Sequence, residues 1–139
     1  MKEAVRSAIS ELEAEAPGTG VRFEEDGEGG AYVIVDAVEI GASFTPSVSW
    51  IGFHITHSYP EAAVYPHYID SALRYDGDGA VPYQHPDGNL PTAITRGDFK
   101  LGGFDLPGIQ VSRSSPKRAP GTDTALAKLC RVISFLETR

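Results

Sequence analysis

The chain has 139 residues, of which 41% are hydrophobic and 22% charged, and this composition fits a single globular domain. Its net charge of −7 disfavours nucleic acid as a partner, and no apolar run approaches the roughly 20 residues that span a bilayer, so no membrane partner is expected either. The single cysteine excludes an intrachain disulfide, and the charged N-terminus lacks the apolar core of a secretion signal, so we expect a cytoplasmic protein.

The first segment is predicted to be an amphipathic helix. Its apolar residues recur at the spacing of one helical face: Val5, Ala8, Ile9 and Leu12. Pro17 and the glycines that follow it end the pattern.

Three strands are expected next, over residues 21–24, 31–40 and 48–56. In the third strand, alternation places Ile51 and Phe53 on one face and His54 on the other. The short connections favour an antiparallel meander, and a fourth extended piece is expected within residues 64–69.

The rest of the chain is predicted to hold a long irregular segment and a closing helix. Residues 75–107 are rich in Gly, Pro and Asp, which is typical of a functional loop. Residues 121–123, ending in Asp123, supply capping residues for the helix, whose apolar stripe is expected to be Leu126, Leu129, Ile133 and Leu136. The predicted fold class is α+β: an N-terminal helix, an antiparallel four-strand meander, a long irregular segment and a C-terminal helix, with the helices packed on one face of the sheet.

This order, with Tyr59-Pro60 after the third strand, resembles the ubiquitin-conjugating (E2) superfamily and its non-catalytic RWD relatives. Members of that superfamily start with a helix, continue through a four-strand meander and carry a Tyr-Pro element at the fourth strand. A Tyr/His-Pro-Asn element usually follows, and residues 83–87 are a degraded version of it. The resemblance implies a single E2-like (UBC/RWD-like) domain over residues 1–139.

The C-terminal third is similar to a bacterial E2-like family. The similarity lies in residues 110–114, which include Ser112-Arg113, and in residues 120–124, which read Pro-Gly-Thr-Asp-Thr before the last helix. That family is encoded in operons with a ubiquitin-like protein, an E1-like adenylating enzyme and a JAB-type peptidase. Its members commonly do not keep the ordinary E2 active site.

An E2 needs a thiol that carries the activated modifier as a thioester. Cys130 falls on the predicted buried stripe of the last helix, so we expect it in the core, where a thiol is not a nucleophile. Counting as in an E2, the cysteine position falls on Thr95, and a hydroxyl without a dedicated base is a poor nucleophile. His85 and Asn89 could assist such a reaction, but the simpler interpretation of residues 84–89 is a Pro-Asp-Gly turn.

No metal site and no cofactor are expected. His54 and His57 are three residues apart and so point to opposite faces of a strand, while His67 lies in a separate segment. No phosphate-binding glycine fingerprint is present, and Ser112 lacks the elbow sequence of a serine hydrolase.

The resemblance favours a non-catalytic E2-like protein in a bacterial ubiquitin-like conjugation pathway. Its expected partners are an E1-like adenylating enzyme, a ubiquitin-like modifier or a partner E2. The residues expected to bind partners are Lys2, Arg6, Glu13, Tyr75, Tyr83 and Phe99. Those expected to be structural are Tyr59, Pro60, Arg113 and Asp123. The alternative is an active, divergent E2 that carries the modifier on Cys130 or on a Thr or Ser hydroxyl, with His85 and Asn89 assisting.

Overall fold

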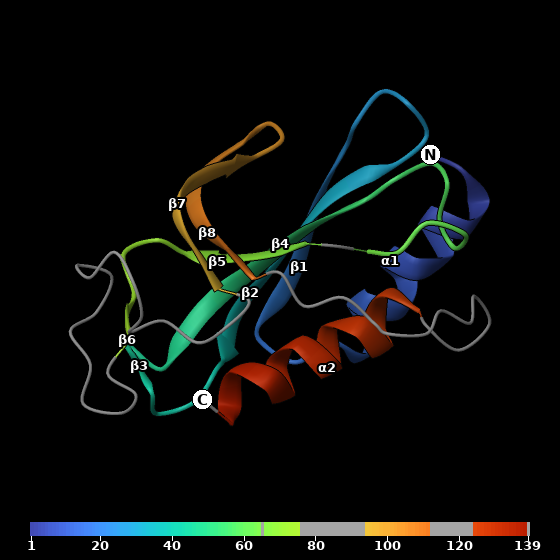
Figure 1. Ribbon diagram of the computed structural model, residues 1–139. Coiled ribbons are helices and arrows are strands. Elements are labelled where there is room, and N and C mark those ends of the chain that lie inside the picture. Colours follow the sequence, from blue (N-terminus) through green and yellow to red (C-terminus); the bar gives the residue numbers. More distant parts are fainter. Residues whose placement is uncertain (65, 76–93, 112–123, 139) are drawn as a thin grey trace.

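The computed structural model describes the whole chain except residues 65, 76–93, 112–123 and 139 (Figure 1). In chain order the elements are α1 (Glu3–Glu15), β1 (Gly20–Glu25), β2 (Ala31–Glu39), β3 (Phe44–Thr45), β4 (Val48–Ile55), β5 (His67–Asp70), β6 (Arg74–Tyr75), β7 (Ile94–Leu101), β8 (Phe104–Val111) and α2 (Ala125–Glu137). This is an α+β fold, as the sequence predicts. None of the helices in the described part is long and apolar enough to cross a membrane.

The main sheet has six strands in the order β1-β2-β4-β5-β8-β7, and every neighbouring pair is antiparallel. β3 and β6 form a separate two-stranded ribbon. The first four strands of this order form a meander in which each strand pairs with the preceding one, with only the β3 ribbon strand interposed along the chain. The prediction of four strands in total is therefore wrong, because two further strands extend the sheet beyond β5.

The two additional strands come from the segment that was predicted to be irregular. β7 and β8 form a hairpin whose turn contains Gly102, with φ at +56°, followed by Gly103. Pro107 pairs with Lys100 beside a register shift of this hairpin, and such irregular steps tolerate proline within a ladder. The glycines and the proline thus belong to a turn and a bulge, and they do not mark the loss of regular structure.

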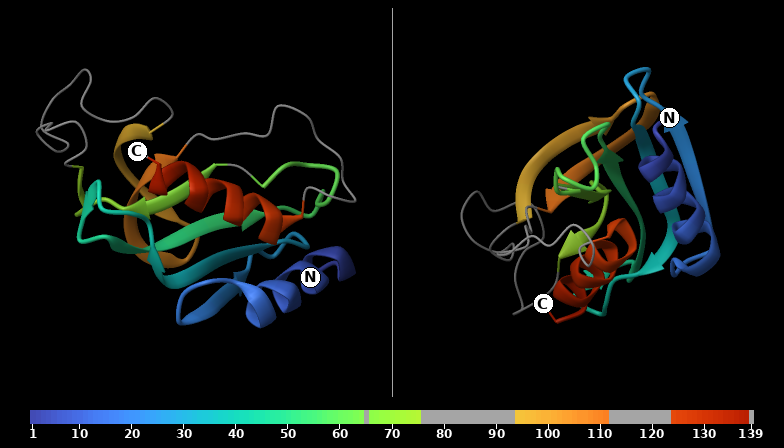
Figure 2. Two further views of the ribbon diagram at one scale, coloured as in Figure 1. Left: turned by 90° about the horizontal axis from the view of Figure 1, so that it is seen from below. Right: turned by 90° about the vertical axis from the view of Figure 1, so that its right-hand side faces the viewer.

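Both helices pack on the same face of the sheet (Figures 1 and 2). The core between them contains the predicted face of α1, Val5, Ala8, Ile9 and Leu12, and the predicted inward face of β4, Ile51, Phe53 and Ile55, so both patterns are confirmed. The largest core side chains are fully buried. Burying one such side chain stabilises the fold by about 2 kcal/mol.

The opposite face of the sheet is partly covered by the β7–β8 hairpin, which lies on the side away from α2 in Figure 1. Leu101 at the hairpin tip and Ile34 on β2 are both buried there. A Cβ at Gly52 of β4 would collide with both side chains, and one at Gly102 would collide with the ring of Tyr32. Glycine at these two positions is therefore required by close approach of the hairpin to the sheet. We call the face of the sheet that points away from the two helices the outer face.

Helix α2 is rotated relative to the prediction. Its buried residues are Ala125, Lys128, Leu129, Val132, Phe135 and Leu136, whereas Leu126 and Ile133 are only partly buried. At about 100° per residue, Cys130 lies about 160° from both Lys128 and Val132. Cys130 is accordingly exposed to solvent, and the prediction that it belongs to the core is wrong.

Candidate partner-binding surface

The start of α1 is fixed to the end of β1 and to the turn that follows it. The N-terminal ammonium of Met1 donates to Oε1 of Glu25 at 2.9 Å, and the backbone N–H of Lys2 donates to the carbonyl of Gly29 at 2.9 Å. The hydrogen bond from the ammonium, its charge and the charge of Arg6 together hold the pKa of Glu25 below its ordinary value. The N-terminal end of α1 therefore lies beside the C-terminal end of β1.

Two of the residues predicted to bind partners, Arg6 and Glu13, lie on one flank of α1, and a third, Lys2, is its N-cap. All three are exposed, and helical geometry places Arg6 and Glu13 within about 20° of one another around the axis. This flank faces β1, because Arg6 acts on the Glu25 carboxylate. The cations occupy the N-terminal end of the flank and the anion occupies its C-terminal end.

Phe23 supplies an apolar contact surface beside this flank. It lies in β1 directly opposite Val33 of the core, so its side chain is on the helix-bearing face of the sheet. It is nevertheless 42% exposed, and it is one of two large hydrophobic residues so exposed in the described part of the chain. In Figure 2 (right), α1 and β1 lie side by side. Five exposed residues at these two elements, Lys2, Arg6, Glu13, Phe23 and Glu25, form what we call the α1–β1 surface.

On the outer face, Asp26 and His54 link the β1–β2 turn to β4. The Asp26 carboxylate is 4% exposed and lies 2.7 Å from Nε2 of His54, and its other oxygen accepts the N–H groups of Glu28 and Gly30. Burial raises the pKa of Asp26, but the hydrogen bonds from His54, Glu28 and Gly30 outweigh it, so the pKa is lowered overall. The ring of Tyr32 stacks on His54 at a centroid distance of 4.2 Å. The Asp26 carboxylate therefore links the β1–β2 turn to β4 through hydrogen bonds to a charged acceptor.

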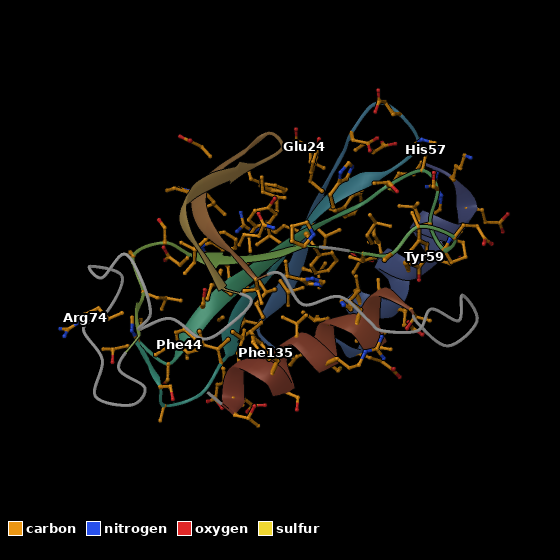
Figure 3. The ribbon with its side chains drawn as sticks, viewed as in Figure 1. Glu24, Phe44, His57, Tyr59, Arg74 and Phe135 are labelled. Atoms are coloured by element: carbon orange, nitrogen blue, oxygen red, sulfur yellow. The ribbon has the colours of Figure 1, made fainter. Side chains whose placement is uncertain are left out.

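Tyr59 connects the segment before β5 to the start of α2. Its hydroxyl oxygen accepts the backbone N–H of Ala125 at 3.1 Å, and the Tyr59-Pro60 peptide bond is cis (Figure 3). The helix is capped by Thr124, whose side-chain oxygen accepts the N–H of Ala127 at 3.1 Å. Thr124 is therefore the N-cap of α2, and Asp123, which was predicted to be structural, lies outside the described residues.

His67 is buried in the core close to Lys128. Its ring is 0% exposed and 4.9 Å from the ring of Phe53, and neither ring nitrogen has a hydrogen-bond partner among the described residues. Burial and the nearby charge of Lys128 lower the pKa of His67 from 6.5 to about 3. The imidazole is therefore neutral at physiological pH, and it packs beside Phe53 with both polar ring nitrogens buried.

Cys130 lies on the solvent face of α2 in surroundings that differ from those of an activated thiol. Its neighbours one turn away on the helix are Leu126, Ala127, Ile133 and Ser134, and none of them is titratable. Side chains three and four residues apart are the ones that meet on a helix surface. Activated thiols sit beside a cation or at a helix N-terminus, and Cys130 is in the middle of α2.

The remaining predicted residues fall in other parts of the chain. Tyr83, His85, Asn89, Arg113 and Asp123 lie outside the described residues. The backbones of Tyr75, Thr95 and Phe99 belong to β6 and β7. His54 is on the outer face, and His67 is in the core. Within the described ranges, no group of three or more His, Cys, Asp or Glu residues is placed to hold a metal ion.

Sequence reasoning missed Phe23 and the Asp26–His54 pair. Phe23 falls in the first predicted strand, but only the strand order reveals that β1 is at the edge of the sheet, where its helix-bearing face is half covered. Asp26 and His54 are 28 residues apart in the sequence. The register that pairs Glu25 with Ala31 and Ala31 with Ile55 brings them together, and counting outward from the β1–β2 turn could have suggested it.

Comparison with known proteins identifies no relative. No family model matches the chain, no curated protein matches its sequence, and no solved structure matches its fold.

Proposed function

We propose that this chain is a non-catalytic E2-like (UBC/RWD-like) domain of a bacterial ubiquitin-like conjugation pathway. Its role would be to bind an E1-like adenylating enzyme, a ubiquitin-like modifier or a partner E2. The observation that carries the proposal is the order of the first elements: α1 followed by the meander β1-β2-β4-β5, with Tyr59-Pro60 in the segment between its third and fourth strands. This is the arrangement that the resemblance implies.

The position of Tyr59 supports the same proposal. Tyr59 forms a hydrogen bond with a residue that is distant in the sequence. Here the hydroxyl of Tyr59 accepts the first N–H of α2, which would otherwise have no helical acceptor. The element therefore joins the segment that follows β4 to the closing helix, as a structural Tyr-Pro element would.

The α1 flank is the surface that we assign to the E1-like enzyme. Its side chains are exposed, charged and held on a helix whose other face is anchored in the core. Charged groups on a rigid helix set the orientation and the association rate of a partner more than its affinity. We therefore expect this contact to depend on charge pattern and on ionic strength.

The test is binding of the intact protein to an E1-like enzyme of such a pathway, measured by calorimetry and by co-elution. Arg6→Glu is expected to weaken binding roughly tenfold, since it reverses a charge at the contact. Glu11→Arg is the matched control: Glu11 is exposed on the opposite flank of α1, so its reversal should leave binding unchanged. Equal effects of both variants, or no complex with any pathway component, would contradict the proposal.

A second candidate function is favoured by one observation, the exposure of Cys130. An accessible thiol is a requirement for an active E2, and this chain meets it. Against it stands the position of Cys130 in the middle of α2, where none of the residues one turn away along the helix is titratable. In this alternative a covalent thioester with the modifier would form on wild type and would be lost in Cys130→Ser.

A further inference from the structure

β1 is an edge strand, and its edge on the side opposite β2 is available for pairing with another strand. It is the first strand of the sheet and pairs only with β2, and within the described part of the chain no other strand lies along it. Five of its six residues are exposed. Open edges of this kind are templates for pairing with another chain unless their side chains prevent it.

The sequence of β1 complements itself when two copies run antiparallel. With Phe23 of each copy opposite the other, Arg22 falls opposite Glu24, and Val21 falls opposite Glu25, so no like charges meet. Arg22 and Glu24 share the outer face, opposite Ile34 and Tyr32 in the register. Arg22 binds Asp36 through Nε and Nη2, each at 2.8 Å, which leaves its Nη1 for a second carboxylate.

The same axis also matches the charges of α1. The helix runs in the direction opposite to β1, because Met1 contacts Glu25 at the end of the strand. A two-fold axis at Phe23 therefore brings the Lys2 and Arg6 end of one flank toward Glu13 of the second copy. Two independent charge relationships, one on each face of the sheet, are satisfied by one symmetry operation.

We infer that a second copy of this chain docks on the α1–β1 surface through antiparallel pairing of β1 about a two-fold axis at Phe23. A stable dimer buries on the order of 1,200 Å² or more, which a six-residue strand alone does not supply. The α1 flanks must then contribute, and the exposed ring of Phe23 becomes the buried centre of the contact. Aromatic residues at the centre of an interface are the usual anchors of binding energy.

This inference goes beyond the proposed function and does not depend on it. The two share the α1 flank, so an E1-like enzyme that binds there would compete with the second copy. Self-association is measured on the protein alone, and partner binding is measured with the E1-like enzyme, so failure of one is distinguishable from failure of the other.

The test is sedimentation equilibrium of the full chain over a range of concentrations. The expected mass rises to about twice 14.9 kDa, and Phe23→Glu is expected to weaken association roughly tenfold or more by placing two carboxylates at the axis. Val48→Glu is the matched control, because Val48 is the other exposed large hydrophobic residue, at 38%, and lies in β4. Circular dichroism confirms that each variant folds.

A set of charge-reversal variants tests whether the two α1 flanks face each other across the two-fold axis. Arg6→Glu and Glu13→Arg should each weaken association, and the double variant should restore it, because the two reversed charges again face each other across the axis. A monomer at all concentrations would overturn the inference. So would a dimer that persists in Phe23→Glu, or a double variant no better than its single parents.

Discussion

The hydroxyl oxygen of Tyr59 accepts the backbone N–H of Ala125 at 3.1 Å, and this hydrogen bond joins positions 66 residues apart. It satisfies a helix N-terminal N–H that the capping side chain of Thr124 does not reach, since Thr124 accepts from Ala127. The loop before β5 and the start of α2 are thereby held together by one polar contact at the margin of the core.

Tyr59→Phe should lower the unfolding free energy by about 1 kcal/mol, because it leaves the Ala125 N–H without its partner. The measurement is urea unfolding followed by circular dichroism. Tyr32→Phe is the control: the Tyr32 ring stacks on His54, and its hydroxyl makes no hydrogen bond among the described residues. Equal stability of Tyr59→Phe and wild type would show that the contact does not form in solution.

Acid should unfold the protein partly through His67. Its pKa is 6.5 when unfolded and about 3 when folded, so the unfolded chain binds more protons between these values. The resulting stability is complete above about pH 6.5 and is lost as the pH falls toward 3. At pH 4.5 the loss attributable to His67 is about 3 kcal/mol.

His67→Leu should therefore reduce the difference in unfolding free energy between pH 7 and pH 4.5, because the buried titrating group is gone. The measurement is urea unfolding at both pH values. His57→Gln is the control, since it removes a histidine that is exposed instead of buried. A pH dependence that survives His67→Leu intact would contradict the burial of this ring.

Asp26→Asn should destabilise the fold by about 2 kcal/mol at pH 7, because charge-assisted hydrogen bonds to His54 and to two backbone N–H groups are weakened together. Since the folded pKa of Asp26 is lowered, this stabilisation is present above the ordinary carboxyl pKa and disappears as the pH falls through the folded value. Glu28→Gln, at an exposed position in the same turn, should have little effect. Thermal unfolding of the two variants at pH 7 separates the cases.

Cys130 should react with a thiol reagent in the native protein as rapidly as in the unfolded chain, because it is exposed. Cys130→Ser should change the unfolding free energy by less than about 0.5 kcal/mol, as expected for a surface substitution. Alkylation followed by mass spectrometry under native and denaturing conditions gives the ratio. Slow native labelling would restore the buried assignment that the sequence suggested.

The sequence predicted the elements whose apolar pattern is repeated and unambiguous. The face of α1 and the alternation of β4 are examples, since each element has one apolar side and the core has only one place for it. The register of α2 was predicted incorrectly because Leu126 and Ile133 fall on the margin of the buried stripe, while Lys128 lies within it. A charged residue at a buried helix position is not visible in a hydrophobic pattern.

The hairpin β7–β8 escaped prediction for a different reason. Gly102, Gly103 and Pro107 are strand breakers when considered locally, and only tertiary contacts show that the glycines fit beneath Tyr32 and Glu24 of the sheet. Figure 3 shows Glu24 near the tip of this hairpin. Part of the α1–β1 surface could be predicted from the sequence, because the positions of the charges on α1 follow from helical geometry. The exposure of Phe23 could not be predicted, because it depends on β1 being an edge strand.

The proposal that this chain is an E2-like domain that does not carry a modifier covalently is tested most directly by intact mass spectrometry. The protein is incubated with the E1-like enzyme, the ubiquitin-like modifier and ATP, and its mass is recorded without reducing agent. The account predicts an unchanged mass for wild type and for Cys130→Ser alike. An added mass equal to the modifier on wild type, absent from Cys130→Ser, would establish a thioester and contradict the account.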